Sequence, residues 1–346
     1  MRHDTALQQL LAVGTGDEPL LLVLDEQASA LKPPRQPASR VLTNRCDVAA
    51  TAGRAGWTAV FDDFAFAAAL GPPCADVRYR ISKEKRVVEQ VLQAAWQWLP
   101  VGGVLWVAGY KEEGIKTFAA RMAAAWQVVP ELQRGERHLH LYRLQKQQPP
   151  PQSLQSADYH RLQVIADWHG EPLYSKPGVF GWDRLDEGST LLLQALDGWL
   201  AERPATGRRA VDLGCGFGLL ALALCQAGCT EVVATDNNAA AITASLATLQ
   251  WWVATGQARV VADDCGGSLG GDFDLLVCNP PFHQGFAVDY DLTERFLQAA
   301  RRLLRPGGRA LFVVNRFVPL ERKATALFRE VRRVGGNDRF QVLGLA

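Results

Sequence analysis

Asn279, Pro280, Pro281 and Phe282 form the stretch whose residue types are best suited to chemistry. They follow an apolar run, 273–277, that predicts a strand, and the two prolines stop this strand and fix the backbone. The turn therefore places an amide and an aromatic ring at a strand's carboxyl end, where open α/β sheets bind ligands. An amide oxygen beside an aromatic face suits a planar amino group, such as the exocyclic amine of a base. A strand that simply ends at prolines, with a Phe in the core, explains the same four residues.

A second stretch with ligand-binding character is a glycine-rich turn between a strand and a helix. The strand ends at Asp212 and Leu213, the turn contains Gly214, Gly216 and Gly218, and a helix over 219–227 follows. Glycines permit a tight turn and let a ligand approach the backbone, but a lone glycine triplet also fits a nicotinamide dinucleotide site. An acid before the first glycine would repel a pyrophosphate and can hold the ammonium of an amino-acid moiety. The pattern therefore favours S-adenosylmethionine (AdoMet) over a dinucleotide.

Two more predicted strands end at carboxylates. Strand 231–235 ends at Asp236, which can accept both ribose hydroxyls or cap the helix that starts at Asn238. Strand 260–262 ends at Asp263 and Asp264, where an acid can accept the adenine amino group or lie in a solvated turn. Three strand ends that each carry a group needed by one cofactor are a stronger signal than any one of them.

The elements that must position these residues alternate between strands and helices throughout the chain, which indicates an α/β layer architecture. The predicted strands of the first half are 20–24, 57–61, 104–108 and 139–144, and its helices are 87–98 and 117–126. The second half is predicted to add a hairpin over 159–174, helices over 190–200, 292–304 and 325–334, and strands over 310–314 and 340–345. A Pro/Gln-rich linker, 145–156, separates the halves, and a length of 346 residues suits two domains.

The two halves share an internal repeat. Residues 91–107 align without a gap on residues 296–312, and both copies place a helix and a Gly-Gly turn before a strand. The first half has no glycine turn after its first strand and no Asn-Pro-Pro-Phe. We therefore predict a duplicated α/β domain whose first copy has lost its ligand-binding loops. Convergence of two helix–turn–strand units on one pattern is the alternative.

Composition narrows the class of protein further. The net charge of +1 argues against non-specific coating of nucleic acid, although local basic patches remain, at Arg78, Arg80, Lys83, Lys85 and Arg86 and in a second group of arginines over 294–339. The seven cysteines form no CxxC pair, which indicates a reducing compartment, and no signal peptide is recognised. We expect a soluble, cytoplasmic protein.

Together these motifs resemble a known family. The run VDLGCGFG, the acids at 236 and 264, NPPF and LRPGG resemble class I AdoMet-dependent methyltransferases. KPGVFGWDRLDEGSTLLL and NPPFHQG are similar to the bacterial ribosomal RNA guanine-N2 methyltransferases, of which the 16S rRNA branch is nearest in length. The resemblance implies two tandem Rossmann-like methyltransferase domains, with a degenerate domain over 1–146, a linker over 147–158 and a catalytic domain over 159–346.

The resemblance also implies an activity, which is AdoMet-dependent methylation of a guanine N2 amine in 16S rRNA. The expected substrate is the assembled small ribosomal subunit, and the enzyme is expected to be a monomer that needs no metal because its methyl donor is already activated. The Asn279 side-chain oxygen and the Pro280 carbonyl would accept the two N–H bonds of the amine, and Phe282 would stack on the base. Phe180 lies in a loop that can cover the cofactor. The residues predicted to bind the cofactor are Asp212, Gly214, Gly216, Gly218, Asp236, Asn237, Asp264, Asn279 and Phe180.

Other functions stay open at this point. The large-subunit rRNA enzyme shares these motifs, and Asn-Pro-Pro-aromatic also serves methylation of DNA adenine and of protein glutamine. A protein of a different class, a non-catalytic RNA-binding ribosome assembly factor, would keep the fold without turnover. The intact glycine turn, Asp236 and Asn279 argue against that interpretation.

Overall fold

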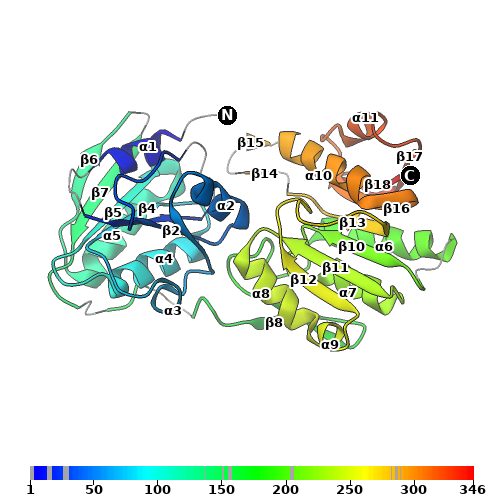
Figure 1. The fold of residues 1–346 in the computed structure, drawn as a ribbon, viewed down its shortest axis with the longest axis horizontal. Helices are drawn as coiled ribbons and strands as arrows, with labels where there is room; N and C mark the ends of the chain where they lie inside the picture. Colours follow the sequence, from blue (N-terminus) through cyan, green and yellow to red (C-terminus); the bar gives the residue numbers. More distant parts are fainter. Residues whose placement is uncertain are drawn as a thin grey trace. The chain divides into compact units, whose positions relative to one another are not determined.

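The computed structural model describes residues 4–13, 18–25, 31–136, 138–149, 152–154, 158–202, 206–281, 283–284, 287–288 and 290–346. The chain divides into two compact units, Met1–His160 and Arg161–Ala346. Each unit is a sheet covered by helices on both faces (Figure 1).

The first unit contains, among its described residues, one seven-stranded sheet with the order β3-β2-β1-β4-β5-β7-β6. Its strands are β1 (Leu20–Leu24), β2 (Arg40–Thr43), β3 (Thr58–Phe61), β4 (Asp76–Arg80), β5 (Val104–Tyr110), β6 (Glu131–Arg134) and β7 (Leu139–Gln145). Its helices are α1 (Thr5–Ala12), α2 (Cys46–Arg54), α3 (Phe66–Leu70), α4 (Lys85–Trp98) and α5 (Ile115–Trp126), with a 3-10 turn, η1, over Lys111–Glu113. The central strands are parallel, and β7 runs antiparallel to both β5 and β6.

The second unit repeats this arrangement. Among its described residues the main sheet has the order β12-β11-β10-β13-β16-β18-β17, which matches the first sheet position by position. Its strands are β10 (Arg209–Leu213), β11 (Glu231–Asp236), β12 (Ala258–Ala262), β13 (Phe273–Cys278), β16 (Leu304–Asn315), β17 (Val331–Gly336) and β18 (Phe340–Leu345). Its helices are α6 (Glu187–Glu202), α7 (Leu219–Gln226), α8 (Ala239–Thr248), α9 (Gln250–Ala254), α10 (Tyr290–Leu303) and α11 (Leu320–Ala324). Two small hairpins, β8 (Gln163–Trp168) with β9 (Glu171–Ser175) and β14 (His283–Gln284) with β15 (Ala287–Val288), complete the unit.

Alternate residues of each strand of the second sheet face opposite helix layers. Ala210 and Val277 pack with α6, α7 and α8, whereas Leu213 and Cys278 pack with α10 and α11. Figure 1 shows these two helix layers on opposite sides of the sheet. Because both faces are buried, the strands are continuous apolar runs, and this is why they were recognisable in the sequence.

The duplication that the repeat predicted is confirmed. Residues 91–107 form the end of α4, the turn and the start of β5, and residues 296–312 form the corresponding parts of α10 and β16. Each helix precedes the fifth strand of its sheet in the common order. The fold class, two tandem Rossmann-like domains, is therefore correct.

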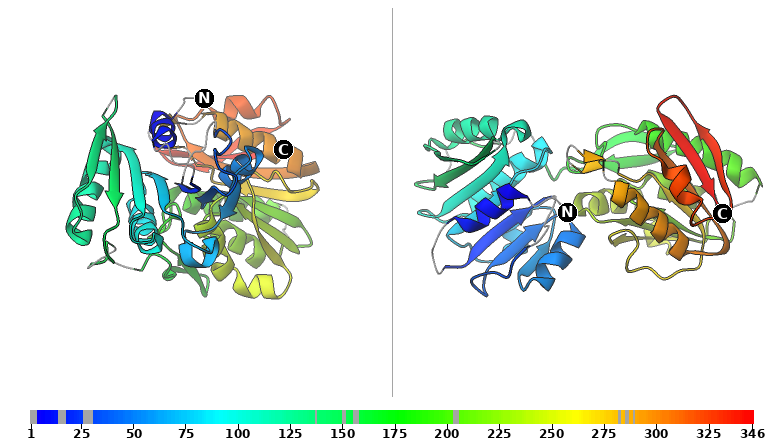
Figure 2. Two further views of the ribbon diagram at one scale, coloured as in Figure 1. Left: turned by 60° about the vertical axis from the view of Figure 1, so that its left-hand side comes forward. Right: turned by 90° about the horizontal axis from the view of Figure 1, so that it is seen from above.

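One predicted helix is wrong. The segment 325–334 was expected to be helical, but the helix α11 ends at Ala324 and residues 331–336 form β17. β17 pairs with β18 from Val331, opposite Leu345, to Gly336, opposite Gln341. The two strands lie at the edge of the sheet, as Figure 2 shows in red. Pairing with a neighbouring strand has overridden a helix-like spacing in an arginine-rich segment.

Part of the predicted linker packs on the first unit. Leu154 of the linker and Tyr159, the first residue after it, belong to the core of that unit, and the Tyr159 hydroxyl donates to Asp63 Oδ1 at 2.7 Å. The division between the units falls after His160, just beyond the predicted linker of 147–158. The role of that segment as a linker stays a prediction.

Among the described residues, no helix combines the length and the apolar composition needed to cross a membrane.

Candidate active site

The glycine turn after β10 is held by groups from two other elements. Gly214, Gly216 and Gly218 have φ values of +81°, +55° and +88°, a region that favours glycine. The Gly216 N–H donates to Asp236 Oδ2 at 3.0 Å, and the Ser245 hydroxyl of α8 donates to the Gly216 carbonyl at 2.7 Å. The turn is thus fixed at its middle residue from both sides. The sequence did not indicate a role for Ser245, because the residues around it indicate only an apolar helix.

Asp236 has a role distinct from that of a helix cap. Its Oδ1 accepts from the Asn238 N–H at 2.9 Å, while the Asn238 side chain caps α8 by accepting from the Ala240 N–H at 2.9 Å. Asn238 Nδ2 also donates to the Gly178 carbonyl at 2.9 Å, which ties the loop before α6 to the start of α8. The N-cap of α8 is therefore Asn238 and not Asp236. Asp236 and Asn237 are both half-buried at the carboxyl end of β11.

Asp212 is fully buried beneath the glycine turn. Its Oδ2 accepts from the Ala221 N–H at 3.0 Å, and its Oδ1 is buried without a hydrogen-bond partner. Burial, with a smaller contribution from the charge of Asp236, raises the pKa of the Asp212 carboxyl to about 8. A buried carboxylate oxygen without a donor is suited to an ammonium group. This site fits the amino-acid moiety of the AdoMet that the sequence predicts.

Two adjacent acids follow β12 and differ in their surroundings. Asp263 is buried, its Oδ2 accepts from the Ser268 N–H at 2.6 Å and from the Ser268 hydroxyl, and its Oδ1 has no partner. Asp264 is partly exposed and forms an ion pair with Arg295. The assignment of Asp264 to the adenine amine stays a prediction. Asp263 offers a second acceptor at the same strand end.

Asn279 follows β13 and is held by the start of α6. Its side-chain nitrogen donates to Asp186 Oδ2 at 2.7 Å and to the Ser189 hydroxyl at 2.9 Å. Asn279 is half-buried and Pro280 is buried. Asp186 also caps α6, since its Oδ2 accepts from the Ser189 N–H at 2.9 Å. The contact of Asp186 and Ser189 with the amide was not predicted from the sequence.

The remaining predicted residues divide into exposed and undescribed ones. Phe180 is 80% exposed, so its side chain is not packed against the site. Phe282 lies outside the described residues. The proposed roles of Phe180 and Phe282 stay predictions.

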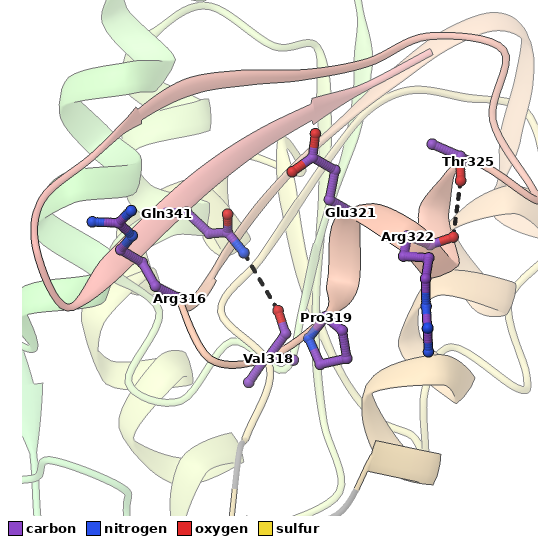
Figure 3. Close-up of a pocket in the computed structure, with 7 residues that line it drawn as sticks. All are labelled: Arg316, Val318, Pro319, Glu321, Arg322, Thr325 and Gln341. Atoms are coloured by element: carbon purple, nitrogen blue, oxygen red, sulfur yellow. Dashed lines mark hydrogen bonds between the residues drawn. The ribbon is translucent and has the colours of Figure 1, made fainter.

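A basic pocket of about 390 Å³ lies where the chain leaves β16. It is lined by Arg316, Val318, Pro319, Glu321, Arg322, Thr325 and Gln341. In Figure 3 the guanidinium groups of Arg316 and Arg322 lie on either side of Val318 and Pro319. Phe317, beside the pocket in sequence, is 58% exposed. Because β13 and β16 are parallel neighbours, their carboxyl ends lie side by side. This pocket and Asn279 are therefore at the same end of the strands.

The structure corrects the interpretation of one predicted basic patch. Arg78 is buried and paired with Asp76 at 2.6 Å, and Arg80 is paired with Asp4 at 2.9 Å and Glu113 at 2.7 Å. Both guanidinium groups are paired with acids of the first unit, so they are not available to bind phosphates. A count of charges along the sequence does not show that these two arginines pair with acids of the same unit.

Comparison with known proteins matches these observations to a family. The Methyltransferase small domain family matches residues 171–344. A protein of Sodalis glossinidius named ribosomal RNA small subunit methyltransferase C is 33% identical over 281 residues, which cover 80% of this chain and 75% of that protein. Its namesake from Chromohalobacter salexigens is 40% identical over 173 residues, which cover 50% of each protein.

A solved structure matches both units together. It is a 16S rRNA methyltransferase of T. thermophilus, named for N2 of guanine 1207, in complex with AdoMet and guanosine. The TM-score is 0.84, the sequence identity is 24%, and the match covers 99% of this chain and 92% of that one. The likeness shows that the fold, two tandem α/β domains, is shared.

Proposed function

The chain belongs to the family of ribosomal RNA small subunit methyltransferase C, and we propose that it methylates the exocyclic N2 amine of a guanine in 16S rRNA, with AdoMet as the methyl donor. The single observation that carries this proposal is the state of Asn279, whose two amide N–H groups are both bonded within the protein. Its Oδ1 is thus the atom left to accept a hydrogen bond from an amino group. An acceptor of this kind selects an amine rather than a ring carbon or a carbonyl oxygen.

The residues of the second unit supply what the reaction needs from a protein. Guanine N2 is a weak nucleophile because its lone pair is delocalised into the ring. When Asn279 Oδ1 and the Pro280 carbonyl accept its two N–H bonds, they orient the amine and stabilise the positive charge that develops on it. Phe282 would hold the base by stacking. The bound AdoMet supplies an electrophilic methyl group, so Asn279 and Pro280 need only position and polarise the amine.

The cofactor is assigned to the three strand ends already described. Asp212 Oδ1 would receive the ammonium, Asp236 and Asn237 the ribose hydroxyls, and Asp264 or its neighbour Asp263 the adenine amine. Gly214, Gly216 and Gly218 bring the backbone close to the ligand. Phe180, exposed in the loop that Asn238 ties to α8, would cover it.

The partner is 16S rRNA, and we propose the assembled small subunit as its form and a cytoplasmic monomer as the enzyme. A base paired within RNA must leave the stack to reach Asn279. Arg316 and Arg322, for which no ion pair is found within the described residues, can bind phosphates that flank the flipped guanine. Phe317 can stack on a neighbouring base.

The test compares labelled-methyl transfer to small subunits, large subunits, free rRNA, DNA and protein. We expect label in 16S rRNA of small subunits lacking the modification, and mass spectrometry should place it on a guanine N2, with guanine 1207, the position named for the T. thermophilus neighbour, examined first. Asn279→Ala should lower the rate by at least about a hundredfold, because it removes an acceptor used in the transition state. AdoMet affinity, measured in parallel, tests the predicted contact of Asn279 with the cofactor. Label confined to protein, DNA or 23S rRNA would reject the proposed acceptor, and full activity of Asn279→Ala would reject the catalytic assignment.

A further inference from the structure

The orientation of the Asn279 amide is set by residues that come 93 and 90 positions earlier in the chain. An ionised carboxylate only accepts hydrogen bonds, so the amide nitrogen and not the oxygen must face Asp186. The second amide N–H is used by the Ser189 hydroxyl at 2.9 Å. With both hydrogens bonded, Oδ1 has one available direction, away from α6.

Asp186 is itself fixed by the helix that it begins. Its Oδ2 accepts from the Ser189 N–H at 2.9 Å, and its backbone carbonyl accepts from the Thr190 N–H and the Thr190 hydroxyl, both at 3.1 Å. The carboxylate therefore cannot turn away from Asn279 without uncapping α6. This couples the first turn of one helix to the end of β13.

Gly188 leaves the space in which this contact forms. A Cβ added at Gly188 would lie 2.9 Å from Asp186 Oδ2 and 3.4 Å from Asn279 Nδ2. The first distance is too short for a real contact, so a methyl group would push the carboxylate and the amide apart. Gly188 has an ordinary backbone conformation, so alanine there would act through this contact and not through backbone strain.

We propose that Asp186 and Ser189 are positioning residues that present Asn279 Oδ1 to the methyl-accepting amine and strengthen it as an acceptor. A negatively charged partner on the amide nitrogen draws electron density toward the amide oxygen, because hydrogen bonds in a chain polarise one another. The Ser189 hydroxyl prevents the amide from rotating about its side-chain bond. The inference rests on the proposed function, since it concerns the group that binds the substrate amine.

The experiment measures single-turnover methyl transfer to unmodified small subunits together with AdoMet affinity and thermal stability. Asp186→Asn keeps an oxygen for both donors and removes the charge, whereas Ser189→Ala releases one amide N–H. Each should lower the transfer rate by roughly tenfold, since a small misplacement of a catalytic group can cost up to about a hundredfold. AdoMet affinity should stay within about twofold of the wild type, because neither side chain is assigned to the cofactor. Ser189→Thr retains the hydroxyl and should restore the rate.

Two comparisons separate positioning from a structural role. Thr190→Val removes a hydroxyl from the same turn that bonds Asp186 but not Asn279, and it should leave the transfer rate unchanged. Ser189→Ala added to Asn279→Ala should lower the residual rate no further, because a residue that acts through Asn279 has no effect once the amide is gone. Gly188→Ala should reproduce the Ser189→Ala defect.

Each result of these measurements either supports or overturns the positioning role of Asp186 and Ser189. Wild-type rates in Ser189→Ala and Asp186→Asn would overturn the inference, as would rate defects that are equal in Thr190→Val or fully additive with Asn279→Ala. A wild-type protein that methylates no ribosomal RNA would instead reject the proposed function. The two failures are therefore distinguishable.

Discussion

The Gly216 N–H donates a hydrogen bond of 3.0 Å to Asp236 Oδ2, which joins the turn after β10 to the end of β11. These two strands are parallel neighbours, so their carboxyl ends meet at one edge of the sheet. The bond means that the acid expected to bind the ribose also shapes the glycine turn expected to surround the same cofactor. Loss of Asp236 should therefore affect two parts of the site at once.

We predict that Asp236→Ala weakens AdoMet binding by about a hundredfold, since hydrogen bonds to a charged group contribute about 1.5–3 kcal/mol each. Asp236→Asn should weaken binding less, because its oxygen can still accept from the Gly216 N–H. Isothermal titration calorimetry measures both affinities. Asp197→Asn, on an exposed position of α6, is the matched control for removal of a carboxylate. Equal affinities for Asp236→Ala and the wild type would remove Asp236 from the site.

Asp212 gives a prediction about proton release. Burial raises the pKa of its carboxyl to about 8, so at neutral pH the folded protein holds a proton that the ammonium of AdoMet would displace. Binding at pH 7 should thus release close to one proton, and affinity should rise as the pH increases toward 8. Calorimetry of S-adenosylhomocysteine in buffers of different ionisation enthalpy measures this release. It should be absent in Asp212→Asn and for methylthioadenosine, which lacks the amino-acid moiety; release that persists in Asp212→Asn would contradict the assignment.

The raised pKa of Asp212 also predicts how the stability of the ligand-free protein depends on pH. The pKa of Asp212 is higher in the folded state than in the unfolded state, so between about pH 4 and 8 the folded state binds more protons. This group therefore stabilises the fold less as pH rises, by roughly 1.4 kcal/mol per pH unit in that window. The difference in unfolding free energy between the wild type and Asp212→Asn, measured by urea denaturation at several pH values, isolates the effect. A difference that does not change with pH would show that Asp212 is ionised in the free protein.

The strand ends were predictable because their signals are local. An apolar run followed by glycine or proline marks the end of a buried strand beside Asp212 and Asn279, and Asp236 ends another apolar run just before a predicted helix. Parallel strands bring those ends to one edge of a sheet, so the sequence alone grouped the three residues. Their roles toward ligands stay predictions.

The contacts that hold these residues were not predictable. Asp186 and Asn279, or Ser245 and Gly216, lie far apart in sequence, and nothing near either residue indicates its partner. The helix expected at 325–334 failed for the same reason, because β18 lies beside that segment only in the folded protein. Local patterns describe elements and their ends, whereas partners depend on the tertiary arrangement.

The pocket at the end of β16 predicts a change in the salt dependence of RNA binding. Replacing Arg316 and Arg322 together by Ala should reduce the slope of log affinity against log salt by about one for each phosphate that the protein no longer neutralises. Arg332→Ala is the control, because this arginine is ion-paired with Glu330 at 2.8 Å. Filter binding of small subunits or a 16S rRNA fragment at several salt concentrations gives the slopes. An unchanged slope in the double variant would exclude this pocket from the RNA interface.

Arg80 in the first unit occupies the place that Asn279 has in the second. The repeat aligns Val107 of β5 with Phe312 of β16; Val107 lies opposite Tyr79 and Phe312 opposite Cys278, so the residues that follow, Arg80 and Asn279, correspond. The Arg80 guanidinium is bound by Asp4 and Glu113, and its side chain is only 12% exposed. The position of the first unit that corresponds to Asn279 thus carries a structural ion-pair network.

We therefore predict that Arg80→Ala destabilises the first unit by about 3–5 kcal/mol, because removing one partner of a buried ion pair leaves uncompensated charge. Arg54→Ala, which removes an exposed arginine of α2, should change the unfolding free energy by less than about 0.5 kcal/mol. Urea denaturation of the full chain measures both. Arg80→Asn restores the residue type of the catalytic copy but should create no second methylating site in Asn279→Ala, since the first unit lacks the glycine turn. Methyl transfer by the Arg80→Asn/Asn279→Ala protein that is faster than the residual rate of Asn279→Ala alone would show that the first unit still binds AdoMet and would refute its assignment as a degenerate copy.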